Sequence, residues 1–139
     1  MKTEMNKQMI KKIFSEMFNG RNFSDMDKII SPEYVNHGMP NAKKGPAGLK
    51  EVLQQFLDGF PDMKINVEHM VAEDNMVATR GYWTGTNTGK FMGMQGTGKK
   101  VRCEFIDLWK IENGMCVENW VQMDMVGVMQ QAGMMPQMA

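Results

Sequence analysis

Apolar residues in the first sixty positions recur every three or four residues, which is the spacing of one face of an amphipathic helix. This pattern predicts one helix over 4–18 and another over 47–60. Between them, a serine at position 24 is placed to cap a short helix over 24–30, which ends before Pro32 because proline disfavours helical backbone in the preceding residue. The segment 31–40 is then predicted to be a loop.

After position 62 the apolar period changes to two, which is typical of strands with one buried face. The alternation predicts a hairpin of strands over 63–71 and 76–86, followed by strands over 101–111 and 115–125. The dipeptide Asn113-Gly114 lies between the last two strands and favours a tight hairpin turn. We therefore expect a meander of antiparallel strands.

Helices followed by such a meander predict an α+β fold, because tight turns leave no room for parallel crossovers. We expect the N-terminal helices to pack on a strongly curved, mostly antiparallel sheet of four to six strands, with a short helical turn at 126–133. Glycines at intervals over 81–98 permit the sheet to bend into a cone whose open end is a pocket. No repeat or linker divides the chain, so residues 1–139 are predicted to form one domain.

The composition narrows the choice of partners. The 139 residues include 16 Lys and Arg against 16 Asp and Glu, so no excess positive charge favours nucleic acid or an anionic membrane. No apolar run approaches the roughly 20 residues of a membrane span, and the charged N-terminus does not resemble a signal peptide. We expect a cytoplasmic protein whose two cysteines, Cys103 and Cys116, are small core or strand residues rather than a disulfide framework.

Methionine is unusually abundant, with 18 residues against four leucines. One interpretation is a simple exchange of one flexible apolar residue for another in helices and core. The other is an adaptable apolar cavity, to which Met92, Met94, Met123 and Met125 could contribute.

The last predicted strand carries the residues with the most interesting chemistry. Strict alternation places Glu118, Trp120, Gln122 and Asp124 on one face, and Asn119, Val121, Met123 and Met125 on the other. Two carboxylates, an amide and an indole suit a partly polar cavity floor, since each polar group in a dry core needs a partner. A solvated outer face is the alternative, and the pattern alone does not decide between them.

The neighbouring strand adds a second carboxylate, Asp107, on the same face as Cys103, Phe105 and Trp109. A regular hairpin at Asn113-Gly114 would place Asp107 and Trp109 beside Trp120 and Gln122. A carboxylate between aromatic rings loses hydration, which raises its pKa and makes it a usable general base near neutrality. Such an aspartate can equally be an ordinary hydrogen-bonded structural group.

Motifs for metals, nucleotides and a serine nucleophile are missing from the sequence. The two histidines and two cysteines are widely spaced, and no HxxxH, CxxC or HExxH arrangement occurs, so we predict neither a metal nor a cofactor. No GxGxxG, GxxxxGK[ST] or GxSxG sequence is present. His37 follows Asn36 in the predicted loop and is a candidate for the pocket mouth, whereas His69 lies at a period-two core position and is expected to be structural.

Several segments taken in order, YVNHG, FPDM, E-x-W-x-x-x-D and Q-x-G, make the chain resemble the SnoaL-like polyketide cyclase family of the NTF2-like superfamily. The resemblance covers nearly the whole chain. It implies an α+β cone and a cofactor-free enzyme that closes a polyketide ring by intramolecular aldol condensation. By the same resemblance the acid/base residue on the last strand is Asp124, and Asn36, His37, Asp107 and Gln122 face the ligand.

The sequence thus leads to an enzyme hypothesis and a binding hypothesis. In the first, Asp124 performs acid/base chemistry, as in a cyclase or an isomerase, on a small apolar or polyketide-like carbonyl compound. Its pocket is expected to contain Tyr34, Asn36, His37, Asp107, Trp109, Trp120 and Gln122. In the second, the chain is a non-catalytic binding or dimerisation domain of the same fold. A homodimer is expected in either case, because the outer strand faces, predicted to carry Arg102, Ile106, Leu108, Val121, Met123 and Met125, are too apolar to stay in water.

Overall fold

The computed structural model of the protein describes residues 2–39 and 41–134. Its helical elements are α1 (Lys2–Lys12), the π-helical η1 (Ile13–Asn19), α2 (Met26–Ile29), α3 (Gly45–Gly59) and α4 (Met125–Gln131). The helix predicted over 4–18 is therefore helical to its end, but its second half has the wider π-helical turn. The other predicted helices are present within a few residues of their expected bounds.

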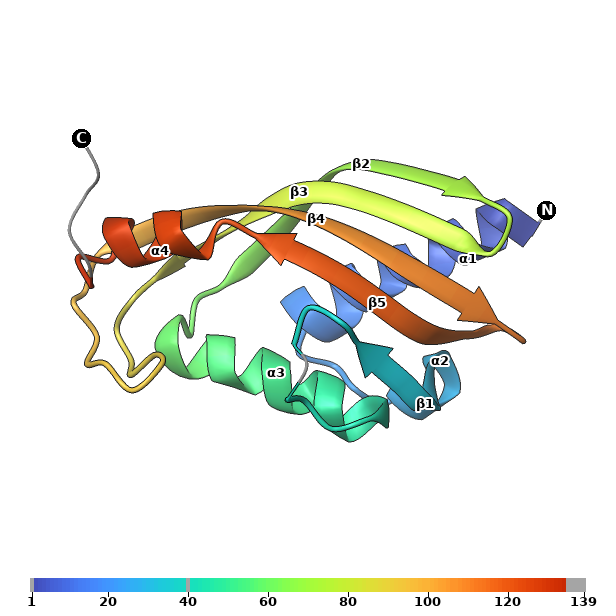
Figure 1. Ribbon diagram of the computed structural model, residues 1–139, viewed down its shortest axis with the longest axis horizontal. Coiled ribbons are helices and arrows are strands. Elements are labelled where there is room, and N and C mark those ends of the chain that lie inside the picture. Colours follow the sequence, from blue (N-terminus) through green and yellow to red (C-terminus); the bar gives the residue numbers. More distant parts are fainter. Residues whose placement is uncertain (1, 40, 135–139) are drawn as a thin grey trace.

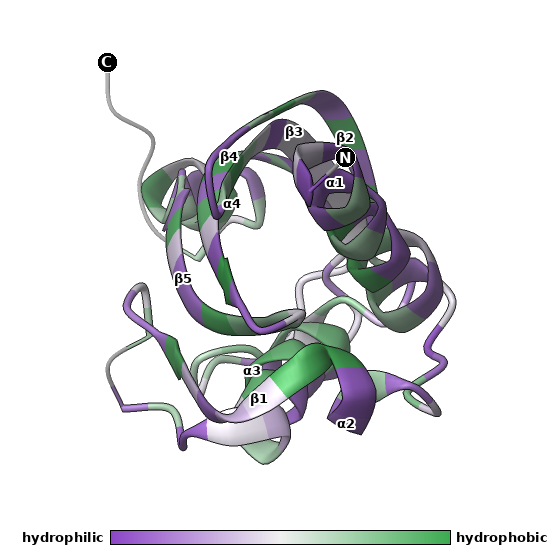
Figure 2. Cartoon of the chain, turned by 90° about the vertical axis from the view of Figure 1, so that its right-hand side faces the viewer, coloured by the Kyte–Doolittle hydropathy of each residue, from purple (hydrophilic) through white to green (hydrophobic). Residues whose placement is uncertain are grey.

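In the described part of the chain, five strands form one sheet in the order β1-β5-β4-β3-β2. They are β1 (Ile30–Asn36), β2 (Lys64–Glu73), β3 (Met76–Thr86), β4 (Lys100–Glu112) and β5 (Met115–Met123). Strands β2 to β5 are an antiparallel meander, and β1 pairs with β5 in parallel. The α+β fold with a mostly antiparallel sheet is confirmed, and Figures 1 and 2 show the sheet curving around α1 and α3 on its concave side.

Strand β1 corrects the prediction of a loop after the second helix. Its partner lies more than half the chain away in sequence, with Ile30 opposite Cys116 and Asn36 opposite Asn119. Local periodicity cannot reveal such a long-range pairing, because the seven residues ISPEYVN contain a proline and lack regular alternation. The pairing brings the first third of the chain against its last strand.

Two register shifts change which side chains face inward. In the β4–β5 hairpin Ile111 pairs with Cys116 but Lys110 pairs with Glu118, so Val117 is an extra residue on β5. In β2 a shift between Val67 and His69 leaves His69 exposed rather than in the core position predicted for it. Each bulge reverses the alternation of the residues that follow it.

Aromatic side chains fill the core between the concave sheet face and the helices. Phe14 of η1 packs edge-on against Trp109 with ring centroids 5.9 Å apart, and Trp83 packs against Phe60 at 5.1 Å and Phe56 at 5.8 Å. Both cysteines are buried and free, as expected of small core residues. Among the described residues, no helix has the length and apolar character that crossing a membrane requires.

Candidate functional site

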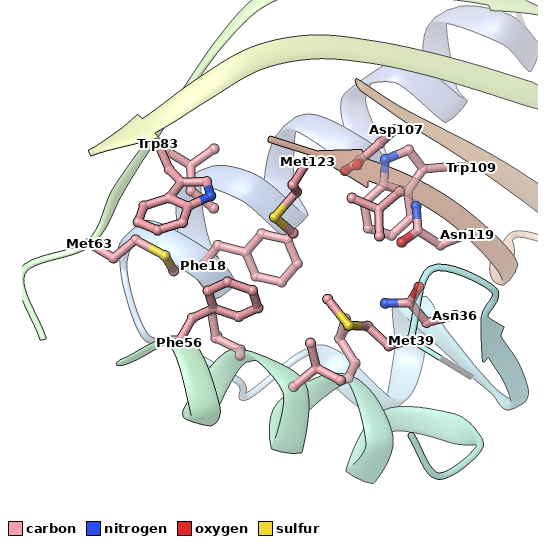
Figure 3. A pocket seen from close by; sticks show the side chains of 15 residues that line it. Phe18, Asn36, Met39, Phe56, Met63, Trp83, Asp107, Trp109, Asn119 and Met123 are labelled. Atoms are coloured by element: carbon pink, nitrogen blue, oxygen red, sulfur yellow. The ribbon is translucent and has the colours of Figure 1, made fainter. Parts of the chain in front are cut away.

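A narrow cavity of about 80 Å³ lies between the concave face of the sheet and α3 (Figure 3). Most of its wall is apolar, and the polar side chains in it are Asn36, Asp107 and Asn119. The apolar lining consists of Phe18, Met39, Leu49, Val52, Leu53, Phe56, Met63, Ile65, Trp83, Trp109, Val121 and Met123. An apolar pocket with a few convergent polar groups is the usual form of a small-molecule site.

Asp107 is the ionisable group of this cavity. It lies on β4 opposite Thr79 of β3, and its side chain is buried. Its Oδ1 atom has no hydrogen-bond partner among the described residues. Burial disfavours the charged carboxylate and raises the pKa of Asp107 to about 8. The group can therefore take up or release a proton near neutral pH.

Asn119 is held in a fixed orientation by two hydrogen bonds. The Tyr34 hydroxyl donates to Asn119 Oδ1 at 3.5 Å, and Asn119 Nδ2 donates to the Leu108 carbonyl oxygen at 3.2 Å. Burial raises the pKa of Tyr34 well above its usual value, so this hydroxyl stays protonated and remains a donor. Tyr34, predicted to line the pocket, lies behind Asn119 and supports it.

Asn36 reaches the cavity from the end of β1. Its Oδ1 accepts a hydrogen bond from the Gly38 amide at 2.9 Å, which closes a tight turn, and Figure 3 shows its amide nitrogen on the pocket side. The His37 amide donates to the Asn119 carbonyl at 2.7 Å and continues the pairing of β1 with β5. Two side-chain amides therefore lie next to each other near Asp107.

The other predicted site residues lie outside this cavity. The His37 ring stacks on Trp120 at 4.8 Å, with its Nε2 atom 3.5 Å from Glu118 Oε1, on the outer side of the sheet. Gln122 is exposed. Asp124 is also exposed, and its Oδ1 accepts a hydrogen bond from the Gly127 amide at 2.9 Å as the cap of α4.

The predicted neighbourhood of Asp107 and Trp109 with Trp120 and Gln122 is wrong, and the bulge at Val117 is the reason. A regular hairpin would place Asp107 opposite Trp120, whereas the observed register pairs Asp107 with Val121 and Trp109 with Asn119. Strand β5 therefore turns Asn119, Val121 and Met123 into the pocket. Sequence reasoning missed Asn119 and Val121, although their less polar face was a signal for the inner side, and it offered Met123 as one possible contributor to an apolar cavity.

A wider hollow of about 750 Å³ adjoins the cavity and shares Met39 and Phe56 with it. The segment between β3 and β4 contributes Lys90, Phe91, Met92 and Gly93 to this hollow, and Met125 lies on its wall. Of the four methionines in the interpretation of an adaptable apolar cavity, Met123 lines the cavity, Met92 and Met125 line the hollow, and Met94 lines neither.

Asn87 fixes the base of this β3–β4 segment. Its Nδ2 donates to the carbonyl oxygens of Gly59 at 3.3 Å and Gly89 at 3.1 Å, and its Oδ1 accepts from the Thr97 amide at 3.0 Å. Because Asn87 is fully buried, these bonds hold both ends of the segment against the end of α3. Within 2–39 and 41–134, no three His, Cys, Asp or Glu side chains gather in a way that could hold a metal ion.

Comparison with known proteins agrees with this architecture. The model of the SnoaL-like polyketide cyclase family matches residues 8–132. No curated protein matches the chain. The chain belongs to the SnoaL-like polyketide cyclase family, and it has the NTF2-like fold of that family.

Several solved structures are similar over nearly the whole chain. AclR from Streptomyces galilaeus has a TM-score of 0.84 and 26% identity, covering 99% of this chain and 86% of AclR. IdmH from Streptomyces antibioticus has a TM-score of 0.80 and 26% identity, covering 92% of this chain and 98% of IdmH. The activity suggested for AclR is that of a hydroxylase and for IdmH that of a polyketide cyclase. TsrD from Streptomyces laurentii, at 21% identity and a TM-score of 0.86 over 97% of this chain and 99% of TsrD, shows the shared fold alone.

Proposed function

We propose that the protein is a cofactor-independent enzyme that performs acid/base chemistry on a polyketide-like ketone, with Asp107 as the general acid and base. The observation that carries this proposal is a buried carboxyl group, with a pKa of about 8, in an apolar cavity. A catalytic group is most effective when its pKa lies near the working pH, because it is then available in both protonation states.

An intramolecular aldol closure is the reaction that fits such a group. The Asp107 carboxylate takes a proton from the carbon next to a ketone, and the resulting enolate attacks a second carbonyl carbon of the same molecule. The protonated Asp107 then returns its proton to the new alkoxide, so the product is an isomer of the substrate. The neighbouring amides of Asn36 and Asn119 are placed to orient a substrate oxygen by hydrogen bonds.

The dimensions favour a substrate that enters only in part. A cavity of about 80 Å³ is smaller than the roughly 300 Å³ at which pockets for drug-sized ligands begin. The part of the ligand that carries the reacting carbonyl would occupy this cavity, and further parts of a larger ligand would lie in the adjoining hollow between Met39, Phe56 and Met92. The flexible methionine side chains can adjust to ligands of different shape.

The role proposed from the sequence for Asp124 passes to Asp107 in this proposal. Asp124 is exposed and caps α4, whereas Asp107 lies in the cavity with the amides. Because both are aspartates, the same substitution can be made at each, and this gives a matched pair of variants.

The test follows proton abstraction directly, so it does not require the natural substrate. The protein is incubated in D₂O with 2-tetralone, a two-ring ketone, and deuterium uptake beside the carbonyl is followed by NMR. We expect the native protein to accelerate the exchange, Asp107→Asn to lower the accelerated rate by about 10²- to 10⁴-fold, and Asp124→Asn to retain it. Loss of exchange in Asp124→Asn alone would return the role to that residue. Binding of 2-tetralone without any accelerated exchange would favour the non-catalytic binding module.

We also propose that the protein is a homodimer that associates through the outer face of the sheet. Ile106 is 58% exposed there, Leu108 36% and Trp120 37%, which is an unusually apolar surface for the outside of a monomer. Val121 and Met123, which the sequence assigned to this surface, face the pocket instead. The interface would therefore be centred on β4 and on Trp120.

A further inference from the structure

Two tryptophans of the cavity have buried N–H groups without an acceptor. Trp83 is 2% exposed and Trp109 is 1% exposed, and both line the cavity. Neither Nε1 atom has an oxygen or nitrogen acceptor among the described residues, and Trp83 has only the weak Cys103 thiol beside it. Native structures leave few buried donors unpaired, so each exception calls for a physical explanation. Two unpaired donors on one cavity indicate that a ligand supplies the acceptors.

The surroundings of Trp83 contain a poor substitute for such an acceptor. Trp83 pairs across the strands with Cys103, whose buried thiol interacts with the indole N–H. A thiol is a weak acceptor, and burial raises the pKa of Cys103 to about 11, so the stronger thiolate acceptor is not formed near neutral pH. The Trp83 N–H therefore remains available to a better acceptor such as a ketone or phenol oxygen.

The two indoles lie at opposite ends of the cavity. Trp109 is two residues from Asp107 on the same face of β4, whereas Trp83 pairs with Cys103, four residues before Asp107. At about 3.3 Å per residue, the strand positions of Trp83 and Trp109 are separated by about 20 Å, and those of Trp83 and Asp107 by about 13 Å. Figure 3 shows the same arrangement, with Trp109 and Asp107 at one end and Trp83 beside Met63 at the other.

We infer that the ligand carries oxygen atoms at both ends of an apolar frame, one bound by the Trp109 N–H beside Asp107 and one bound by the Trp83 N–H. This defines the substrate class as a ring-bearing ketone with a second ketone or phenol oxygen remote from the reacting carbonyl. The binding of the first oxygen beside Asp107 rests on the proposed function, and the binding of the second oxygen by Trp83 goes beyond it. Trp83 is then a specificity-determining residue rather than a catalytic one.

Selectivity follows from the cost of leaving a buried donor unpaired. A ligand with the second oxygen satisfies Trp83, whereas a ligand of similar shape without it excludes water and leaves the N–H with only the Cys103 thiol. Sites that are built to hydrogen-bond a substrate oxygen reject analogues lacking it more strongly than apolar pockets reject analogues of altered size.

The indole N–H resonances of the native protein provide a direct test. The chain has three tryptophans, and Trp120, on the outer face, is an internal control. The ¹⁵N-labelled protein is titrated with 2-tetralone, which has one oxygen, and with 6-hydroxy-2-tetralone, which has a second oxygen at the far end. We expect both ligands to shift the Trp109 N–H resonance downfield, and only the second ligand to shift that of Trp83.

Affinities of two variants complete the test. Trp83→Phe keeps an aromatic ring but removes the donor, so its affinity for 6-hydroxy-2-tetralone should fall by about 3- to 10-fold, while that for 2-tetralone is retained. Trp109→Phe, the matched control, should weaken both ligands. An equal loss for both ligands in Trp83→Phe would overturn the inference. If Trp83→Phe does not fold, the titration of the native protein decides alone.

The outcomes separate the inference from the proposed function. A Trp109 response without a Trp83 response to 6-hydroxy-2-tetralone would overturn the second-oxygen site and leave the site at Asp107 intact. If Asp107→Asn loses the accelerated exchange and both indole N–H resonances respond in the native protein, the results support both the proposed function and the second-oxygen site. If neither indole responds at ligand concentrations that saturate exchange, the inference is overturned and exchange occurs elsewhere on the protein.

Discussion

Replacement of Asp107 by Asn should make the protein more stable at neutral and alkaline pH, although it removes the proposed catalytic group. The folded protein holds this carboxyl with a pKa of about 8, whereas the unfolded chain exposes it with the ordinary value near 4. Between these values the unfolded state releases the proton and the folded state retains it. The native protein therefore loses stability as pH rises through this window, and the loss is complete above about pH 8.

The size of the effect follows from the gap between the two pKa values. Each unit of difference corresponds to about 1.4 kcal/mol, so the burial of Asp107 costs up to about 5 kcal/mol at pH 8 relative to pH 4. Asparagine has nearly the same shape and does not titrate. The stability of the variant relative to the native protein should therefore increase with pH by a few kcal/mol.

Urea denaturation at a series of pH values between 4 and 9 measures this difference. Subtracting the native from the variant free energy of unfolding at each pH cancels the titrations that both proteins share. Asp124→Asn serves as the control, since asparagine keeps the side-chain oxygen that accepts from the Gly127 amide and caps a helix about as well as aspartate, so its stability should change little. A difference between Asp107→Asn and the native protein that stays constant from pH 4 to 9 would refute the reasoning about the buried carboxyl.

Two further predictions concern the outer face and the β3–β4 segment. Ile106→Glu should convert the proposed dimer to a monomer in sedimentation at micromolar concentration, while the exposed control Glu104→Gln should leave it unchanged; a native monomer would contradict the proposed interface. Asn87→Ala should lower the free energy of unfolding by about 2 to 3 kcal/mol, because it leaves buried groups such as the Gly59 carbonyl without their partner. The control Asn41→Ala, at an exposed position, should lower it by less than about 0.5 kcal/mol. Equal costs at the two asparagines would show that these bonds add little.

Local patterns predicted much of the fold because each element carries its own signal. The α3 stripe, the strand alternation and the Asn-Gly turn depend only on neighbours in sequence, and each is found within a few residues of its expected place. The inward face of β4 was also predictable, since strict alternation continues along its whole length, with Cys103, Phe105, Asp107 and Trp109 buried and the residues between them exposed.

The composition of the site was only partly predictable, for two physical reasons. The bulge at Val117 has no distinctive residue, yet it reverses β5 and exchanges Trp120 and Gln122 for Asn119 and Val121. The parallel pairing of β1 is set by contacts with a strand far along the chain. Asn36, Asp107 and Trp109 were expected near the ligand, and the structure places them in the cavity wall. Asp107 and Trp109 lie on β4, where the alternation is regular, whereas Asn36 was expected from the family resemblance and not from its local pattern.

The pairing of β1 with β5 has a consequence for the order in which the chain becomes functional during its synthesis. Asn36 emerges early, but the neighbour that completes its part of the wall, Asn119, lies more than half the chain later. The β2–β3–β4 meander can form beforehand from local contacts, whereas closure of the wall must await the whole of β5. Until then the apolar interior is open on one side, so the synthesis of β5 both completes the binding site and shields the nascent domain from aggregation.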